Sequence, residues 1–523
     1  MGKGGKAKPQ FSRGVVALGV FLFFGFIFVF FGGLSSSASF LSSGGMLDSD
    51  RSRYYNVKVL PATLSDDELA SLPHSSFSYI TVVDAGSSGC RAHVYRYGKL
   101  GTLDGPLYIL PQHKSLKVKP GLSTFKDNPN DAGKSLQGLI DFMKEEVPEA
   151  DWSSTPFFLK ATAGLRMLKE SEREAILMSI RTFMGDSRVS PFLFRDAWAR
   201  VIPGNEEGGF GWLAYNYLMK LVGPHKKNTS QKPYAVIEMG GASAQISQMA
   251  TTVEERAAIS PHHLFEFEID GEQYTLFTHS YLGYGAEQAR EALNRRVSES
   301  YRTASGTGPV KDPCLNSGFK MEAGKSNADV YYGPEEGAKS GAVGASTDGS
   351  KCSTEVRAAL FPQADSQDTA KCSSDRPPFP CVQIPDFVRN AENMMTFENF
   401  FYTASGIGVA SVTNPDGTGT KQEFPLQTTP QSFAKAAKQV CEVSWDGVDA
   451  KYPVDGQDKD KNIKWCFAAS YMAEFLLRGM ALNPSKPITI TKEVSGSEVE
   501  WALGAAYKEA AELLRRSNLR PTQ

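Results

Sequence analysis

The feature that most constrains the fold is a pattern that occurs twice in the chain. In FSYITVVDAGSSG, residues 77–89, an apolar and β-branched run ends in Asp84 and a loop of small residues. In YAVIEMGGAS, residues 234–243, a second apolar run ends in Glu238 and a similar loop. Short apolar runs bounded by glycine turns are typical of buried strands. The repetition predicts two homologous α/β lobes, each presenting a strand-end acid and a phosphate-sized loop to a shared cleft.

Both loops have the composition of an anion-binding site. Small residues let backbone N–H groups approach a phosphate closely, and serine hydroxyls add donors. A carboxylate does not bind phosphate directly at neutral pH, so Asp84 and Glu238 are expected to hold, through water, a divalent cation that neutralises the phosphate. Two plain tight turns are the alternative interpretation. It has to explain why both loops lie at a strand end and follow an acid.

A third segment contains candidate groups for activating water. Glu206 and Glu207 lie in IPGNEEG, at the start of a helix-like segment. One of them could serve as a general base, although paired acids at a helix N-terminus are often only favourable partners of the helix dipole. The sequence has neither a G-x-S-x-G elbow nor a G-x4-G-K-[ST] P-loop, so serine-hydrolase and Walker-type chemistry have no support.

The N-terminal region predicts a membrane anchor. Four basic residues and no acid lie within residues 1–13, before the uncharged apolar run of residues 14–34. A helix of that length crosses the ~30 Å hydrocarbon core, and the basic flank predicts a cytoplasmic tail and a lumenal body. A cleaved signal peptide is the alternative, although its apolar core would be shorter. Residues 35–76 are Ser-rich and predict a stem, with the folded part beginning near Phe77.

The cysteines and one sequon fit a lumenal compartment. Six of the seven cysteines lie in the later half of the chain, an even set suited to three disulfides, whereas Cys90 lies in the first glycine loop. The residues alone do not choose among the fifteen connectivities that six cysteines allow. A zinc site is the alternative role for these cysteines, but the sequence has no C-x2-C pair to support it. Asn228 begins the sequon N-T-S and is expected to be glycosylated.

Charge and local patterns add further expectations. The net charge of −2 excludes a nucleic-acid binder, which needs a clustered basic excess. Asp270-Gly271 between two alternating runs predicts a hairpin with a type I′ turn. Residues 303–350 and 404–430 are poorly periodic and predict surface insertions, and the spacing of Ser497 and Glu500 predicts a capping box at the start of a terminal helix.

Six ordered motifs carry a resemblance to a known family. DAGSSGCR, KATAGLR, IPGNEEGGFGW, EMGGASAQ, THSYLGYG and EVEWALGAA occur in the order of the apyrase conserved regions. The chain therefore resembles the nucleoside triphosphate diphosphohydrolases, the family of ecto-apyrases and Golgi guanosine/uridine diphosphatases. KVKPGL at residues 117–122 and the single predicted anchor look more like the Golgi branch than the two-anchor cell-surface apyrases.

The resemblance implies two RNase H-like lobes of the actin/sugar-kinase/Hsp70 type around a central nucleotide cleft, preceded by one transmembrane helix. Lobe I is expected at residues 77–203 and 488–512, lobe II at 204–487 and a C-terminal tail at 513–523. The resemblance also implies that the six later cysteines pair in sequence order, as Cys314–Cys352, Cys372–Cys381 and Cys441–Cys466.

Matching motifs also assign site roles. Glu207 matches the catalytic base, and Ser243 and Gln245 match the residues that orient the nucleophilic water. Asp84 and Glu238 match the two acids of the metal's water shell. The positions that match phosphate-binding residues are Ser87, Ser88, Gly89, Thr162, Gly241 and Ala242. Tyr402 and Trp501 match an aromatic pair that sandwiches the nucleobase, whereas their sequence context alone favours core aromatics.

Two positions depart from the family pattern. Glu238 stands where Asp is usual, and its extra methylene changes the reach of the carboxylate, which bears on metal preference or rate. Cys90 stands where Thr or Ser is usual, and a thiol is a poorer donor and a potential redox-sensitive position.

The predicted function is hydrolysis of nucleoside diphosphates such as GDP and UDP in the Golgi lumen, with Ca²⁺ or Mg²⁺ as the cation. A broader form of this prediction adds ADP and ATP as substrates. One alternative is a cell-surface apyrase acting on extracellular ATP and ADP. Others are a membrane-anchored nucleotide-binding protein with weak catalysis and a kinase or chaperone-type ATPase of the same fold. The sequence does not show which nucleotide is the preferred substrate or which metal is the preferred cofactor.

Overall fold

The structure, a computed structural model, describes residues 57–227, 230–305, 310–320, 331–334, 351–362, 384–409, 424–452 and 463–518. The predicted anchor, most of the predicted stem, Asn228, Cys372 and Cys381 lie outside these residues. Within the described ranges, no helix is both long enough and apolar enough to cross a membrane.

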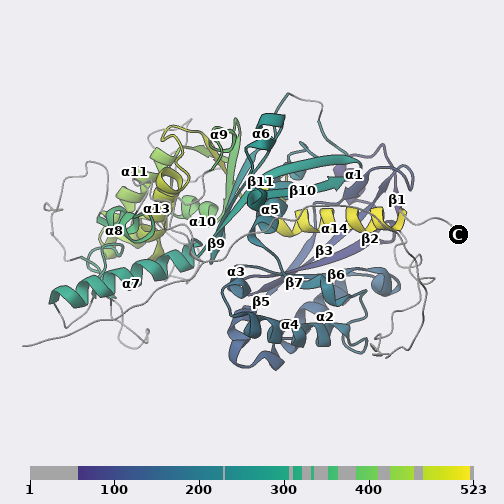
Figure 1. Cartoon of the computed structure of the whole chain (residues 1–523), viewed down its shortest axis with the longest axis horizontal. Helices are drawn as coiled ribbons and strands as arrows, with labels where there is room; N and C mark the ends of the chain where they lie inside the picture. The colour runs from purple at the N-terminus through teal and green to yellow at the C-terminus, as the bar shows by residue number, and fades with distance from the viewer. Residues whose placement is uncertain are drawn as a thin grey trace, which may run out of the picture. The chain divides into compact units, whose positions relative to one another are not determined.

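The first sheet is built around a buried antiparallel pair. Its path is β1 (Val59–Leu60), β3 (Cys90–Leu100), β2 (Ser78–Ala85), β6 (Phe157–Ala161) and β7 (Ala199–Val201), with β4 (Leu107–Ile109) and β5 (Lys114–Val118) pairing with β3. Strand β2 is antiparallel to β3 and parallel to β6. Most of β2 is buried, which explains why it reads as an almost continuous apolar run. Helices α2 (Gln137–Glu146) and α4 (Glu170–Gly185) pack on one face, below the sheet in Figure 1.

The second sheet repeats this arrangement. Its order is β10 (Leu264–Ile269), β11 (Glu272–Leu282), β9 (Ser243–Met249), β8 (Ala235–Met239), β14 (Met394–Glu398), β16 (Ile488–Ile490) and β15 (Leu426–Thr428). Strand β8 is antiparallel to β9 and parallel to β14, as β2 is to β3 and β6. One face packs on α7 (Ala286–Ser305) and on the helices after it. The predicted pair of related α/β lobes is confirmed.

Two helices join the sheets through a common apolar core. Helices α5 (Gly204–Leu218) and α14 (Trp501–Asn518) contact each other and lie centrally in Figure 1. Their apolar residues share one buried cluster with Val82 of β2 and Val236 of β8. The remaining described helices are α1 (Asp66–Ala70), α3 (Ala163–Arg166), α6 (Val253–Ala257), α8 (Lys351–Leu360), α9 (Asp386–Arg389), α10 (Asn399–Ile407), α11 (Pro430–Cys441), α12 (Trp445–Lys451) and α13 (Trp465–Glu474). Two small separate sheets are formed by the short strands β12 (Val310–Lys311) and β13 (Tyr331–Tyr332), and by β17 (Glu493–Val494) and β18 (Ser497–Glu498).

Local turn and disulfide predictions have mixed outcomes. Asp270 and Gly271 both have positive φ between β10 and β11, so the predicted hairpin is confirmed. The disulfides Cys314–Cys352 and Cys441–Cys466 are present, and Cys90 is a buried free thiol. The predicted capping box is wrong, because Ser497 lies in the β17–β18 hairpin and α14 begins at Trp501. Positive φ at Ser495 and Gly496 makes the turn of that hairpin.

Three predicted boundaries need correction. Folded structure begins before Phe77, because β1 pairs with β3 and both Leu60 and Leu69 are buried in a core cluster, so residues 57–76 are not stem. Strand β16, placed by the prediction in lobe I, pairs with β14 in the second sheet. The predicted insertions are shorter, because α7 extends to Ser305, α10 extends to Ile407 and β15 occupies 426–428. Low periodicity does not distinguish short paired strands and helix ends from loops.

Candidate active site

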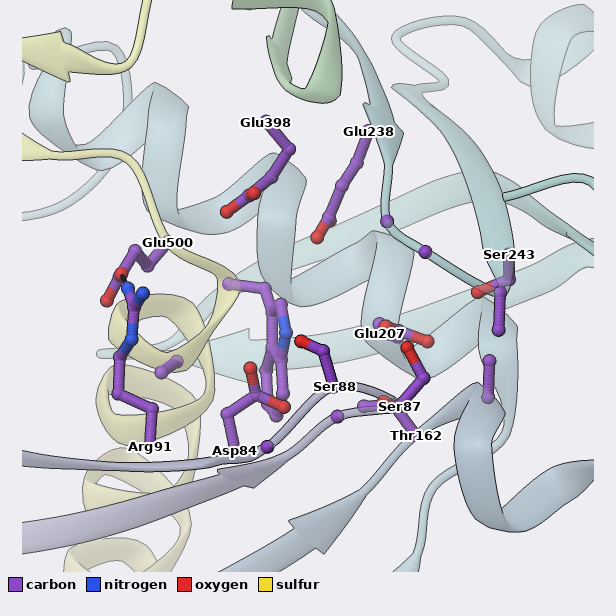
Figure 2. A pocket seen from close by; sticks show the side chains of 18 of the residues that line it. Asp84, Ser87, Ser88, Arg91, Thr162, Glu207, Glu238, Ser243, Glu398 and Glu500 are labelled. Carbon is purple, nitrogen blue, oxygen red and sulfur yellow. Dashed lines mark hydrogen bonds and ion pairs between the residues drawn. The ribbon is translucent and has the colours of Figure 1, made fainter. Parts of the chain in front are cut away.

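One pocket brings the two glycine loops together. It is lined from both sheets and from the starts of α5 and α14, and Figure 2 shows the acidic side chains that point into it. The predicted site residues that line it are Asp84, Ser87, Ser88, Gly89, Thr162, Glu207, Glu238, Gly241, Ala242, Ser243 and Trp501. Gln245 reaches the same site by hydrogen bonding to Glu207 and Ser243.

The two loops have the same internal hydrogen bond. Gly86 N donates to Gly89 O over 3.0 Å, and Gly240 N donates to Ser243 O over 3.0 Å. The loops also approach each other, because a Cβ placed on Gly241 would lie 2.9 Å from Ser87 Oγ. A side chain at this position would therefore require Ser87 and Glu287 to move. The resulting space is lined by small residues of both loops, among them Ser87, Ser88 and Ser243, which is a suitable environment for phosphoryl oxygens.

The strand-end acids carry buried oxygens that have no partner. Asp84 Oδ1 and Glu238 Oε2 make no hydrogen bond to any described residue. Burial raises the pKa of both carboxyls well above their usual values, and the nearby charge of Glu207 raises both further. An unpaired buried carboxylate is costly unless a cation or proton compensates it. Two orphaned carboxylate oxygens therefore fit the oxygen-donor chemistry of Mg²⁺ or Ca²⁺.

The two adjacent glutamates on α5 have different partners. Glu206 forms an ion pair with Arg200, at 2.8 Å from one guanidinium nitrogen. Glu207 instead faces the pocket, where it forms an ion pair with Arg166 and accepts a 3.1 Å hydrogen bond from Gln245 Nε2. The absence of a side chain at Gly208 permits this approach, because a Cβ there would lie 2.8 Å from hydroxyls of β9 and β11.

Glu207 belongs to a compact polar network. Gln245 Nε2 also lies 2.7 Å from Ser243 Oγ, and Arg166 lies 3.3 Å from the same oxygen. Burial raises the pKa of Glu207, while the Arg166 charge and hydrogen bond act to lower it. A carboxylate whose pKa is moved upward and which is fixed by directed donors has the properties of a general base.

The two residues predicted to stack on the base lie in different surroundings. Trp501 is buried in the pocket wall, and its ring lies parallel to Phe210 with centroids 6.2 Å apart. Tyr402 is 55% exposed on α10 and has its described ring contact with Phe401. Partial burial and then the charge of Glu398 raise the pKa of the Tyr402 phenol. The stacking role of both residues stays a prediction.

Several charged residues that line the pocket or contact its lining have no role in the sequence-based prediction. Arg166 pairs with Glu207, and Arg91 pairs with Glu500 directly before α14. Glu398 ends β14, has φ of +57°, and has its pKa raised to about 7 by burial and the charge of Glu500. The acid after the apolar run MMTF repeats the strand-end signal of Asp84 and could have revealed Glu398. A positive φ is costly for a residue with a side chain, so the surrounding structure holds Glu398 in place.

Facing small-residue loops, orphaned acids and an arginine-held glutamate define a class of enzyme that transfers phosphoryl groups to water. Residues 71–521 match the model of the GDA1/CD39 (nucleoside phosphatase) family, and the chain belongs to this family. The family resemblance of the six motifs is thereby confirmed. The chain is a nucleotide phosphatase that hydrolyses phosphoanhydride bonds.

Individual relatives support the same assignment. The chain is 29% identical to probable apyrase 4 of Arabidopsis thaliana over 443 residues, covering 82% of this chain and 79% of the relative. It is 27% identical to a guanosine-diphosphatase of Schizosaccharomyces pombe over 449 residues, covering 83% and 74%. Among solved structures, nucleoside triphosphate hydrolases from Neospora caninum match with a TM-score of 0.56 at 16% identity, covering 84% and 93% of the two chains. That likeness confirms the fold.

Proposed function

We propose that this enzyme removes the terminal phosphate from nucleoside diphosphates with the help of a divalent cation, and that Glu207 is its general base. The observation that carries the proposal is the position of Glu207, which faces a pocket bordered by both loops and is fixed by Arg166 and Gln245. Triphosphates are the broader alternative substrates, as the apyrase relatives suggest.

The side chains suggest a division of labour. Glu207 accepts a proton from the attacking water, and Ser243 and Gln245, which hydrogen-bond to each other over 2.7 Å, orient that water. Backbone N–H groups of the two loops and Thr162 bind the phosphoryl oxygens as negative charge develops on them. Water attacks phosphorus directly, so no covalent enzyme intermediate is required.

Asp84 and Glu238 would hold the cation, because their orphaned oxygens form a hard donor set that points into the pocket. When bound there, Mg²⁺ or Ca²⁺ neutralises charge on the phosphate oxygens and on the leaving group. Glu238, with its longer side chain, is the position where we expect the choice between these two ions to be tuned.

Substrate and location follow from the relatives and from the N-terminal sequence. The guanosine-diphosphatase relative favours GDP, and chemically similar UDP, as substrates. The uncharged run of residues 14–34 with its basic flank favours a type II anchor and a lumenal body. Two disulfides suit an oxidising compartment of the secretory pathway. We place the enzyme in the Golgi membrane, with the cell surface as the alternative.

The decisive experiment compares two neighbouring glutamates. Glu207→Gln should lower kcat by about 10²- to 10⁴-fold, the usual contribution of a general base, while nucleotide affinity stays within a few-fold of the wild type. Glu206→Gln is the matched control, because Glu206 pairs with Arg200 away from the pocket. Phosphate release is measured for both variants and the wild type. Undiminished turnover in Glu207→Gln would exclude Glu207 as the base.

A substrate panel tests the finer assignment. Phosphate release from GDP, UDP, ADP and ATP is measured with Mg²⁺, with Ca²⁺ and with a chelator. The proposal expects the diphosphates GDP and UDP to have the highest kcat/KM and the chelator to abolish activity. A preference for ATP would instead support the apyrase alternative, and activity in the chelator would remove the cation from the proposal.

A further inference from the structure

A cluster of nitrogen and oxygen ligand atoms at one edge of the pocket has no part in the proposed hydrolysis. We propose that His93, His113 and Glu500 form a second metal site, for a transition-metal ion of the Zn²⁺ class. His93 and Glu500 line the pocket, and Figure 2 shows Glu500 beside Arg91, on the other side of Asp84 from Glu207. The three ligand atoms all lie within 4.8 Å of one another.

The spacing of these atoms suits a small tetrahedral ion. His93 Nδ1 lies 2.9 Å from Glu500 Oε2 and 3.1 Å from His113 Nε2, and the latter two atoms are 3.6 Å apart. Zinc–ligand bonds of about 2.0–2.2 Å at tetrahedral angles require ligand separations of about 3.3–3.6 Å. The cluster therefore needs adjustments of only a few tenths of an ångström to accept such an ion.

Few N–H donors are available for hydrogen bonds among the three ligand atoms of the cluster. His113 Nδ1 lies 3.2 Å from Pro111 O, so this nitrogen carries the proton of a neutral ring, and Nε2 of that neutral ring presents a lone pair to the cluster. Neutral His93 brings at most one proton on Nδ1 to the two acceptors that face it. Glu500 Oε2 is buried, and His93 Nδ1 at 2.9 Å is the nearest ring nitrogen that could donate to it. A metal ion satisfies all three atoms at once.

The surroundings resemble the outer shell of a metal site. The Pro111 carbonyl fixes the tautomer of His113, and Arg91 pairs with the second carboxylate oxygen, Oε1 of Glu500. The side chains of His93, His113 and Glu500 are only 1%, 6% and 9% exposed, so solvent competes little for the ligands.

The chain brings the ligands together from separate elements. His93 lies on β3, His113 directly precedes β5, and these strands pair antiparallel. Arg91 and His93 share one face of β3 because side chains alternate along a strand. Glu500 arrives from the far end of the chain, immediately before α14. A bound ion would tie the start of α14 to the first sheet.

Ligand type separates this site from the proposed cation site at Asp84 and Glu238. Two imidazoles and one carboxylate favour Zn²⁺, Co²⁺ or Ni²⁺, whereas Mg²⁺ and Ca²⁺ prefer oxygen-only sets. Excess Mg²⁺ should therefore leave the His93–His113–Glu500 site available while it occupies the other. A protonated histidine pair bound to Glu500 is the competing explanation of the same distances.

The test measures metal binding by the purified full-length protein. The protein is stripped with a chelator, equilibrated with Zn²⁺ in excess Mg²⁺ and desalted, and its zinc content is measured by mass spectrometry. The proposal expects one equivalent of Zn²⁺, and ligand-field absorption of a low-coordinate site when Co²⁺ replaces it. Competition with a chromophoric chelator then gives the affinity. A wild-type protein that retains no zinc overturns the proposal in favour of the protonated pair.

Variants identify the ligands. His113→Ala and, separately, Glu500→Gln should weaken Zn²⁺ binding by about 100-fold or more, since even the loss of outer-shell partners costs 10–100-fold. His263→Ala is the matched control, because His263 Nδ1 lies 3.3 Å from His279 Nδ1 in the other close histidine pair. If His263→Ala loses affinity for Zn²⁺ while His113→Ala and Glu500→Gln keep it, the proposed ligands are wrong. If one ligand variant fails to fold, the other and the Co²⁺ spectrum of the wild type still decide.

Discussion

The two halves of the pocket are variations on one structural unit. In the first half, strand β2, its glycine loop and strand β3 are followed along the chain by the parallel strands β6 and β7 and then by helix α5. In the second half, β8, its glycine loop and β9 are followed in the same way by β14 and β16 and then by α14. Both loops close with the same 3.0 Å backbone hydrogen bond. Each unit also ends in a helix that starts near a glutamate, Glu207 on α5 and Glu500 before α14.

These two glutamates differ in their electrostatic surroundings. Burial raises the pKa of Glu207 despite its ion pair with Arg166. Burial also acts to raise the pKa of Glu500, but the histidine pair and Arg91 hold it well below its usual value. The comparison teaches that the duplicated scaffold surrounds its two glutamates differently, with Arg166 beside Glu207 and with Arg91 and two histidines beside Glu500. This difference supports Glu207 over Glu500 as the base we propose.

The largest effect should come from removing the cation that pairs with Glu207. Arg166→Met leaves a buried carboxylate uncompensated, which should cost about 3–5 kcal/mol of stability. Arg166 acts to lower the pKa of Glu207, so its loss raises that pKa further. A base must be ionised to act, and the acid limb of the kcat/KM profile should therefore move to higher pH. Chemical denaturation and a pH–rate profile measure the two effects.

Arg200→Met provides the control for that experiment, because Arg200 pairs with the neighbouring Glu206 outside the pocket. It should leave the acid limb in place. Arg166→Lys keeps the charge and should restore part of both effects. An acid limb that stays fixed in Arg166→Met would mean that another group controls it, and the contrast between the two halves would lose its functional meaning.

Local sequence pattern was enough to predict the two halves, because each strand and loop is encoded by contiguous residues. The apolar runs before Asp84 and Glu238 correspond to β2 and β8, and all six predicted phosphate-binding residues line the pocket. The partners of the acids could not be predicted in this way. Arg166 reaches Glu207 across 41 positions, and Arg91 reaches Glu500 across 409, so only the folded topology brings them together.

A second prediction concerns an acid present in one half only. In the parallel pairing, Ala161 lies opposite Ala85 in the first half, whereas Glu398 lies opposite Met239 in the second. Burial and the charge of Glu500 raise the pKa of Glu398 from 4.5 to about 7. The charged form is therefore disfavoured in the folded state, and stability should fall as pH rises from about 4.5 to about 7.

Glu398→Gln should remove that loss, which corresponds to about 3 kcal/mol between the two ends of the window. Denaturation in a chelator at several pH values measures it, since a bound cation would compensate the charge. The difference in stability between variant and wild type should widen with rising pH. A difference that is constant from pH 4 to pH 8 would show that Glu398 is not buried as an unfavourable charge.

The third prediction asks whether both halves share one cation. Asp84→Asn and Glu238→Gln should each raise the Mg²⁺ concentration needed for half-maximal activity by about 10- to 100-fold, as expected for groups that hold a metal through water. Both acids have an orphaned buried oxygen, which predicts similar effects. Metal titrations of phosphate release measure them, with Glu206→Gln as control. A shift in one variant alone would assign the ion to a single half.

The smallest effect should distinguish the two loops themselves. A Cβ on Gly241 would lie 2.8 Å from Glu287 Oε2 and 2.9 Å from Ser87 Oγ, whereas a Cβ on Gly86 would meet nothing closer than 3.5 Å. Gly241→Ala should therefore displace the Ser87 hydroxyl from its place in the pocket and raise KM about tenfold, equivalent to about 1.4 kcal/mol. Gly86→Ala should stay within about twofold. Equal KM values for the two variants would mean that the position of the Ser87 hydroxyl does not control nucleotide binding.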